Sequence, residues 1–205
     1  MAEFIIILQI VLLSYFLGSI PFGVVLAKIF HLPDPRYIGS GNIGATNMLR
    51  TGNKKVAALT LLLDAGKGAA TVLITDHLFN DSPAALQALA LLASAMGHMY
   101  SPWLKFKGGK GVATILGAAI AFSWPLGMSF VVFWLLTVFI TRTVSLGSII
   151  ALALMPLVAW LRIDGTSALI IAVAAAVAIW KHHGNISRLR HGLEPKLNLG
   201  KGAKS

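Results

Sequence analysis

Three polar stretches of the chain contain the residue types that bind phosphate. The first runs from Gly39 to Arg50 and reads GSGNIGATNMLR. Its glycines permit positive φ angles and a close approach of the backbone to a ligand, and its Ser, Thr and Asn side chains add hydrogen-bonding groups. Arg50 adds a planar guanidinium that can hold a phosphate with two parallel hydrogen bonds. The stretch predicts an anion-binding loop; a flexible Gly/Ser/Asn loop is the alternative.

The second stretch ends in Gly108-Gly109-Lys110-Gly111, directly before an apolar segment. A glycine-rich turn at a helix N-terminus offers free N–H groups and the positive end of the helix dipole to an anion. It is not a Walker A motif, because Gly rather than Ser or Thr follows Lys110. A tight turn with a lysine that reaches the membrane interface is the alternative. His98, upstream, could orient this loop or contact the ligand.

The third stretch begins at Lys181, and in it His182 and Asn185 lie one helical turn apart, so both can face one pocket. His182 could act as a base or as a donor to phosphate. The alternative is an interfacial amphipathic stretch that binds anionic lipid head groups.

A charged pair, Asp64 and Lys67, lies inside an apolar segment. The two residues are three positions apart and share one face of a helix. A charge pair in the hydrocarbon region of a membrane is expected to serve function. A pair that neutralises itself and only packs is the alternative.

Composition shows what must position these residues. The chain has 205 residues, of which 57% are hydrophobic and 12% charged, with a mean hydropathy of +0.80. A soluble domain carries about 25% charged residues, so the bilayer must be the solvent. The apolar runs are long and unbroken, which predicts an all-α, polytopic membrane protein. We expect apolar segments at residues 4–30, 56–77, 84–100, 111–122, 126–141, 144–161 and 166–182.

The fourth of these seven segments is too short to span a bilayer alone. Residues 112–140 could instead form one long helix, but that would move the basic tail to the outer side. The net charge is +10, and the positive-inside rule places Lys and Arg in cytoplasmic loops. We therefore expect about seven transmembrane helices, with the N-terminus outside and the C-terminus cytoplasmic. Residues 1–196 form a single transmembrane domain, and 197–205 a short basic tail, expected to be disordered.

Cysteine is absent from the sequence, and only seven acidic residues are scattered along it. The lack of cysteine excludes thiolate metal sites and a thioester intermediate. We expect no metal site and no cofactor, which leaves open a Mg²⁺ ion carried by a substrate.

The polar stretches resemble motifs of the bacterial acyl-phosphate:glycerol-3-phosphate acyltransferases, the PlsY family. The resemblance is carried by Ser40–Arg50, Gly97–Thr114 and His182–Lys196, with support from Asp64-x-x-Lys67-Gly68 and Ser145–Ser148. It covers about residues 18–196. It implies a seven-helix enzyme of the bacterial inner membrane with its active site facing the cytoplasm. The enzyme would move a fatty acyl group from acyl phosphate to the 1-position of glycerol 3-phosphate. The products would be lysophosphatidic acid and inorganic phosphate, in the first step of bacterial phospholipid synthesis.

The resemblance also implies roles for individual residues. The catalytic set would be His182, Arg50, Lys110 and Ser40. The substrate-binding set would be Asn42, Thr46, Asn47, Lys67, Gly108, Gly109, Gly111, Ser145 and Asn185. Glu194 would brace the tail by pairing with a loop Lys or Arg. The base stays open between His182 and a phosphate oxygen of the substrate, with the substrate slightly favoured.

The partners expected are glycerol 3-phosphate, acyl phosphate and membrane lipid, and no nucleic acid. An acyl phosphate is a mixed anhydride with a good leaving group, so its transfer needs neither a cysteine nor a metal. A transporter or flippase for phosphorylated lipid is the alternative function, although transporters more often show internal repeats and charges towards the midplane. An anionic-lipid-binding regulator and an acyltransferase that uses acyl-CoA are further alternatives.

Overall fold

The computed structural model describes residues 1–79 and 83–197, which form helices and no strand. Residues 198–205, most of the tail predicted to be disordered, lie outside the described residues. The α-helices are α1 (Ala2–Gly18), α2 (Phe22–Ile29), α3 (Ala45–Met48), α4 (Lys54–Leu78), α5 (Ala84–Met99), α6 (Val112–Phe122), α7 (Trp124–Thr141), α8 (Val144–Arg162), α9 (Gly165–Trp180) and α10 (His183–Arg190). Three short 3-10 helices, η1 (Pro35–Tyr37), η2 (Leu49–Thr51) and η3 (Pro102–Leu104), lie in the connections. The expected all-α class is confirmed.

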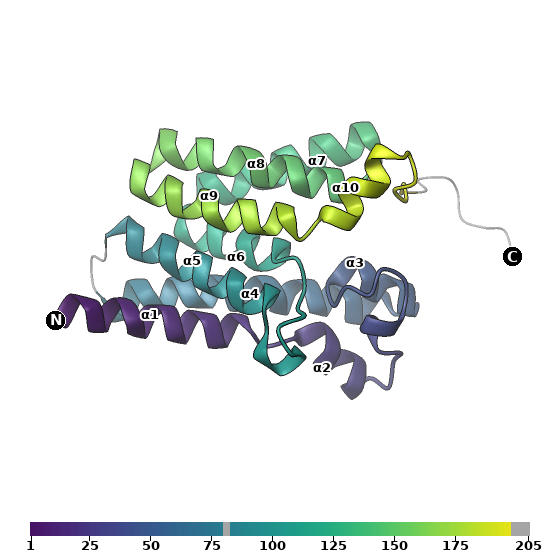
Figure 1. The fold of residues 1–205 in the computed structure, drawn as a ribbon, viewed down its shortest axis with the longest axis horizontal. Helices are drawn as coiled ribbons and strands as arrows, with labels where there is room; N and C mark the ends of the chain where they lie inside the picture. Colours follow the sequence, from purple (N-terminus) through teal and green to yellow (C-terminus); the bar gives the residue numbers. More distant parts are fainter. Residues whose placement is uncertain (80–82, 198–205) are drawn as a thin grey trace, which may run out of the picture.

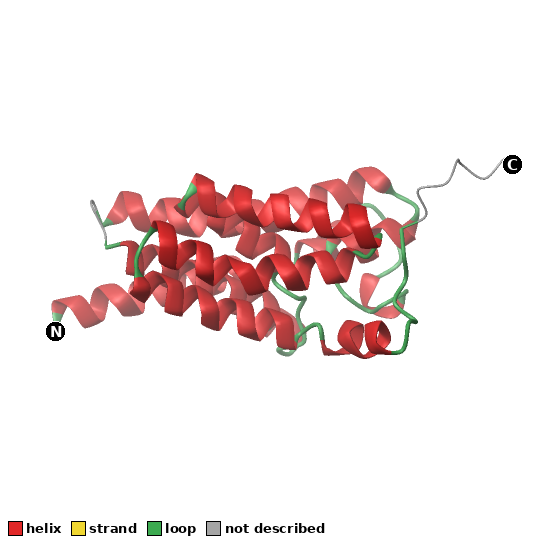
Figure 2. Cartoon of the chain, turned by 90° about the horizontal axis from the view of Figure 1, so that it is seen from above, coloured by secondary structure: helices red, strands yellow, loops and turns green. Residues whose placement is uncertain are grey.

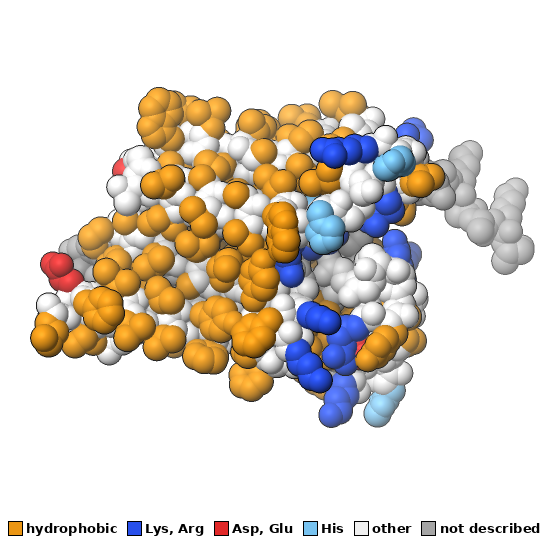
Figure 3. Space-filling model, viewed as in Figure 1, with side chains coloured by type: hydrophobic (Ala, Val, Ile, Leu, Met, Phe, Trp, Pro, Cys, Tyr) orange, Lys and Arg blue, Asp and Glu red, His pale blue; other side chains and the backbone are white. Residues whose placement is uncertain are grey.

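The long helices run side by side along one axis (Figure 1), and the view from above shows the same bundle (Figure 2). Helix α4 packs against α6, α1 against α5, and α8 against both α7 and α9. Helices α2, α3 and α10 gather with loops 30–44, 100–111 and 191–197 at one end, which we call the polar end. Lys and Arg side chains collect at this end, whereas the rest of the visible face is mainly hydrophobic (Figure 3).

Four stretches of the described residues are long and apolar enough to cross a bilayer. They are Glu3–Ile29, Lys54–Leu78, Trp124–Thr141 and Val144–Arg162. Helices α9 and α10, which meet at a 60° bend, make a fifth if they count as one span. Helix α5 has 16 residues and α6 has 11. By length and composition, therefore, four or five spans are shown, and the expected number of seven stays a prediction.

A break separates α6 from α7, as one of the two sequence interpretations requires. Ser123 is extended, with φ −156° and ψ 112°, and Pro125 lies in the first turn of α7. Proline suits that position because its missing N–H has no partner inside the helix anyway. The alternative of one long helix over residues 112–140 is wrong.

The first apolar segment, expected to run unbroken over residues 4–30, is divided into α1 and α2. Pro21 causes the division, because proline cannot donate to the helix and disfavours helical geometry at the residue before it. The break frees carbonyl groups, and other elements supply the donors. Ser101 Oγ donates to the Ser19 carbonyl at 2.7 Å, and Lys67 Nζ donates to the Ile20 carbonyl at 2.7 Å.

Small residues let the helix backbones approach one another, as is common in membrane bundles. Gly117 of α6 faces the backbone of α4, where a Cβ atom would collide with the carbonyl of Ala65. Gly66, on the neighbouring position of α4, is exposed and would meet nothing within 4 Å. The α4–α6 contact therefore depends on Gly117 and does not depend on Gly66.

Substitution of Gly117 by Ala should lower the stability of the protein by about 1–3 kcal/mol, the usual cost of overpacking. Gly66→Ala makes the same chemical change in open space and should leave stability unchanged or raise it. Thermal unfolding of both variants in detergent checks this. Equal melting temperatures for the two variants would contradict the close α4–α6 contact.

Candidate functional site

One buried amide organises the loop between Gly39 and Arg50. Asn47 Oδ1 accepts hydrogen bonds from Ser40 N at 3.0 Å and from Ser40 Oγ at 3.2 Å. Its Nδ2 donates to the carbonyls of Pro35 and Asn42, both at 2.8 Å. Asn47, predicted to bind substrate, thus has both polar atoms of its side chain engaged by the protein. Its amide fixes the shape of the loop.

The other polar side chains of this loop face outward. Ser40, Thr46 and Arg50 are exposed, and Asn42 is half-buried. Arg50 lies over Gly39, where a Cβ atom would collide with the guanidinium and where φ is +55°, so glycine is required on both counts. Within the described residues no hydrogen bond or ion pair engages the Arg50 guanidinium. Its donors are free for an anion.

The glycine-rich loop folds back onto the end of α5. Gly108 N donates to the Met99 carbonyl at 3.2 Å, and Gly109 N donates to the His98 carbonyl at 3.1 Å. A Cβ atom on Gly109 would collide with the His98 ring. The sequence predicts that these glycines let the backbone approach phosphate, but both N–H groups already cap carbonyls of α5. The two glycines serve close packing in this arrangement.

Free backbone N–H groups begin at Lys110, the residue after Gly109. Gly111, with φ +80°, is the N-cap of α6. Among the described residues, the backbone N–H groups of 110–114 engage no acceptor. The first N–H groups of a helix lack partners inside it and favour anions. The expected anion-binding turn is therefore displaced towards the start of α6, with Lys110 beside it.

Lys110 belongs to a hydrogen-bonded network centred on Glu194. Lys110 Nζ donates to Asn185 Oδ1, and Asn185 Nδ2 donates to Glu194 Oε1 at 2.6 Å. Ser145 Oγ donates to the same carboxylate at 2.6 Å, and Arg188 Nε donates to Oε2 at 2.7 Å. The network joins the starts of α6 and α8 to α10 and the segment that follows it. Glu194 pairs with Arg188 of α10, and not, as was expected, with a Lys or Arg of another loop, because Arg188 lies only six residues before it.

The surroundings set the charges of the network. Burial lowers the pKa of Lys110 to about 8, and the negative charge of Glu194 partly offsets this. Lys110 is therefore protonated at neutral pH. Burial opposes ionisation of Glu194, but hydrogen bonds from Ser145, Asn185 and Arg188 prevail and hold the pKa of this carboxyl below its ordinary value. The network thus combines a cation and an anion in one partly buried site.

His182 lies beside this network in a defined protonation state. Its Nδ1 is 2.8 Å from the Ala178 carbonyl. A carbonyl only accepts, so Nδ1 carries the proton and Nε2 presents a lone pair. Burial lowers the pKa of His182 to about 4; the hydrogen bond to Ala178 opposes this shift, and nearby Lys110 adds to it. The ring is neutral at physiological pH and serves as a hydrogen-bond acceptor.

The pair of Asp64 and Lys67 lies deeper and includes a third residue. Lys67 Nζ is 2.8 Å from Asp64 Oδ1, an ion pair without hydrogen-bond alignment. The same nitrogen is 2.9 Å from His98 Nδ1 and donates to Ile20 O. Lys67, predicted to bind substrate, is 4% exposed, and its ammonium group contacts only protein atoms among the described residues. The sequence alone does not decide whether His98 orients the glycine-rich loop or contacts the ligand. Its contact with Lys67, 31 residues away, appears only in the structure.

Apart from Lys67, which lies deeper, the predicted residues fall into two groups at the polar end. One group surrounds Asn47 and presents Ser40, Thr46 and Arg50. The other joins Lys110, Asn185 and Ser145 through Glu194, with His182 beside them. Gly108, Gly109 and Gly111 belong to the second group through the loop that carries Lys110. Glu194 and Arg188 complete the second group, although neither was predicted to bind a ligand.

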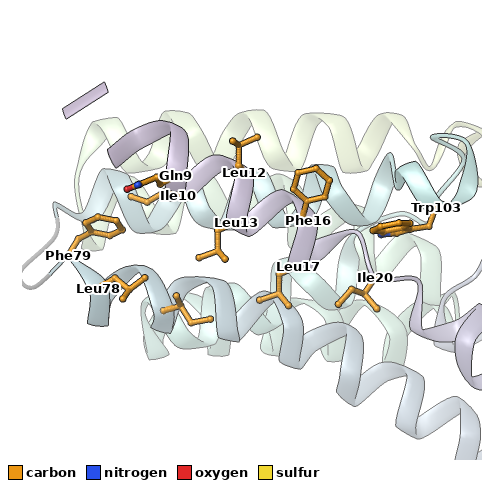
Figure 4. Close-up of a pocket in the computed structure, with 11 residues that line it drawn as sticks. Gln9, Ile10, Leu12, Leu13, Phe16, Leu17, Ile20, Leu78, Phe79 and Trp103 are labelled. Carbon is orange, nitrogen blue, oxygen red and sulfur yellow. The ribbon is translucent and has the colours of Figure 1, made fainter. Parts of the chain in front are cut away.

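An apolar groove lies apart from both groups. It has a volume of about 970 Å³ and runs between α1 and α4, from Gln9 and Phe79 to Trp103 (Figure 4). None of the lining residues that the structure describes carries a charge. The groove cannot neutralise a phosphate, so the polar end holds the candidate site and the groove suits hydrocarbon.

Known proteins resemble this chain over nearly all of its length. A family model described as "Glycerol-3-phosphate acyltransferase" matches residues 8–192. A glycerol-3-phosphate acyltransferase of Jannaschia sp. (strain CCS1) is 48% identical over 187 residues, which are 91% of this chain and 90% of the relative. One from Roseobacter denitrificans is 48% identical over 190 residues, 92% of this chain and 93% of the relative.

Two solved structures share the fold. Both are crystal structures of PlsY, described as an integral membrane glycerol 3-phosphate acyltransferase. The glycerol 3-phosphate form has a TM-score of 0.87 and 39% identity, and the match covers 94% of this chain and 96% of that one. The lysophosphatidic acid form has a TM-score of 0.85 and 38% identity, with 94% and 95% covered. Sequence, fold and polar motifs agree: the chain belongs to the glycerol-3-phosphate acyltransferase family, the family of PlsY.

Proposed function

We propose that the protein transfers a fatty acyl group from acyl phosphate to the 1-hydroxyl of glycerol 3-phosphate, with release of lysophosphatidic acid and inorganic phosphate. The main support is the Lys110–Asn185–Glu194 network at the start of α6, where the backbone N–H groups are free, with a neutral His182 beside it. Two phosphate groups need two sets of cationic and N–H donors, and the polar end offers two sets. Acyl phosphate is the donor that the resemblance to the PlsY family implies, and transfer from this mixed anhydride needs no cysteine, which the sequence lacks.

The proposed reaction is a direct displacement at the acyl carbon. The 1-hydroxyl oxygen attacks the carbonyl carbon of the mixed anhydride, and the new C–O ester bond forms. The bond from that carbon to the phosphate oxygen then breaks, and both of its electrons leave with the phosphate. Arg50, Lys110 and the N–H groups at the start of α6 are placed to stabilise the charge that develops on phosphate oxygens. Ser40 orients the ligand, and Asn185 positions Lys110 by accepting a hydrogen bond from its ammonium group.

The hydroxyl proton passes to the leaving phosphate in this proposal. The leaving phosphate gains negative charge as its bond to the acyl carbon breaks, and it accepts the proton at that point. His182 Nε2, which has a lone pair, accepts a hydrogen bond from the hydroxyl and orients its oxygen towards the acyl carbon. The role of His182 is positioning of the acceptor by direct contact.

The membrane orientation is part of the proposal. The helices span the bacterial inner membrane about seven times, with the N-terminus outside and the polar end in the cytoplasm. The collection of Lys and Arg at the polar end supports this (Figure 3). Exposed tryptophans mark both interfaces: Trp103 and Trp180 lie at the polar end, and Trp124 and Trp160 at the other. Membrane lipid then surrounds the bundle, and both substrates meet at the cytoplasmic interface.

The donor and the role of Arg50 can be tested together. Detergent-purified protein should convert labelled glycerol 3-phosphate to lysophosphatidic acid with palmitoyl phosphate, and not with palmitoyl-CoA or palmitoyl-carrier protein. Arg50→Ala should reduce turnover by about 10²–10³-fold, as loss of a charge-stabilising donor does. Arg190→Ala, an exposed arginine at the same end, is the matched control and should retain activity. Product with the thioesters would overturn the donor, and no product from folded protein would favour a transporter or flippase.

The pKa of Lys110 predicts how kcat/KM falls on the alkaline side (the alkaline limb) of its pH profile. Because this ammonium loses its proton above about pH 8, kcat/KM should fall through that pH, by about tenfold per unit where the deprotonated form dominates. The substrate phosphates are already fully ionised there and do not contribute. Lys110→Arg keeps its charge and should remove the limb. An unchanged limb in Lys110→Arg would assign it to another group.

Replacement of His182 tests its role as an acceptor. His182→Gln retains a hydrogen-bond acceptor and should keep measurable turnover, whereas His182→Ala should lose more, by about 10-fold or above. Initial rates with palmitoyl phosphate at pH 6–8 check this. If both variants were equally inactive while folded, proton transfer to the imidazole would replace the proposed transfer to phosphate.

A further inference from the structure

Asp64, Lys67 and His98 form a cluster of ionisable groups that the proposed reaction does not use. Their side chains are 2–4% exposed, and they come from the middle of α4 and the last turn of α5. A pair that only neutralised itself would need no partner beyond its own helix. Lys67 instead makes two hydrogen-bonding contacts outside α4, to Ile20 O at 2.7 Å and to His98 Nδ1 at 2.9 Å.

These contacts determine which nitrogen of His98 carries the proton. An ammonium group has three donors and no acceptor, so His98 Nδ1 accepts from Lys67 at 2.9 Å; Asp64 Oδ1 is 3.5 Å from the same nitrogen, without hydrogen-bond alignment. The ring proton then lies on Nε2. That nitrogen faces Gly109, because a Cβ atom on Gly109 would collide with Nε2 and, slightly further away, with the neighbouring ring carbons. Lys67 therefore fixes the tautomer and the orientation of a ring that supports the glycine-rich loop.

The loop rests on this ring and on the carbonyls beside it. Gly109 N donates to the His98 carbonyl at 3.1 Å, and Gly108 N to the Met99 carbonyl at 3.2 Å. Gly109 is buried, and the next residue is Lys110. Two consecutive contacts, from Lys67 to His98 and from the His98 ring to Gly109, thus connect the ion pair in α4 to the backbone immediately before Lys110. The other end of the connection is Ile20, at the Pro21 break between α1 and α2.

We propose that Asp64, Lys67 and His98 are positioning residues for the Gly108-Gly109-Lys110 loop, acting through the contact of the His98 ring with Gly109. They touch no substrate. Asp64 pairs with Lys67, Lys67 holds the His98 ring by Nδ1, and the ring determines the position of the loop from which Lys110 reaches Asn185. The inference that this affects turnover rests on the proposed acyl transfer; the inference that it fixes the loop does not.

Backbone hydrogen exchange tests the positioning directly and requires no reaction. Lys67→Met should speed exchange at the amides of Gly108 and Gly109 by roughly five- to tenfold, the effect of weakening about one hydrogen bond. Ser94→Ala is the matched control, because it removes a buried hydroxyl from α5 one turn before His98 and leaves the loop contacts intact. It should leave exchange at these two amides unchanged. Unchanged exchange in Lys67→Met, or an equal rise in Ser94→Ala, would overturn the proposal.

His98→Asn keeps the test decisive if Lys67→Met does not fold. The asparagine amide oxygen can accept from Lys67 as Nδ1 does, so the buried ammonium stays satisfied. The variant lacks the part of the ring that meets Gly109. It should therefore show the same faster exchange at Gly108 and Gly109 as Lys67→Met, with a melting temperature close to that of the wild type. Full protection of the two amides in His98→Asn would overturn the role of the ring.

A double-mutant cycle tests whether the effect on turnover passes through Lys110. Lys67→Met should reduce turnover, and the double variant Lys67→Met/Lys110→Ala should be no slower than Lys110→Ala alone, within about twofold. A general loss of structure would instead multiply the two effects, and that result would overturn the proposed coupling. If the wild type made no lysophosphatidic acid but the exchange results held, the loop positioning would stand and the proposed reaction would fail.

Discussion

The carboxylate of Glu194 holds together the end of the molecule where the chemistry is expected. It accepts hydrogen bonds from Ser145 at the start of α8 and from Asn185 and Arg188 of α10. Through Asn185 it also fixes Lys110, at the start of α6. A cation that is partly buried needs such a partner, because burial without pairing is costly. The same carboxylate thus makes the charge of Lys110 compatible with its partial burial.

A second constraint comes from the bilayer, in which every backbone polar group needs a partner inside the protein. Pro21 breaks the first helix and frees carbonyls at Ser19 and Ile20. Ser101 and Lys67 satisfy them, so the break in one helix is tied to α4 and to the loop that follows α5. The buried lysine therefore serves the fold and, through His98, the geometry of the glycine-rich loop. Fold and site share one set of polar contacts.

The helices were largely predictable, since long apolar runs and the Ser123–Pro125 break are local properties of the sequence. The helix break at Pro21 was not predicted, because Pro21 lies inside an apolar run. The carbonyls that it frees are satisfied by Ser101 and Lys67, which are distant in the sequence. The motifs selected residues most of which the structure brings to the polar end, but they did not predict how these residues contact one another. Asn47 and Gly109 look like ligand-binding residues in a phosphate-suited loop. Only their partners in space, the carbonyl of Pro35 and the ring of His98, show that they organise the loops.

The central claim is that phosphate is recognised by fixed groups rather than by a generally basic surface. Equilibrium binding of glycerol 3-phosphate by isothermal titration tests it most directly, with Arg50→Ala and Lys110→Ala compared against Arg190→Ala and Lys55→Ala. Each pair removes the same charges from the polar end of the chain. The account predicts at least about tenfold weaker binding for one or both of the site variants and unchanged binding for the two controls. Equal weakening in all four variants would contradict it.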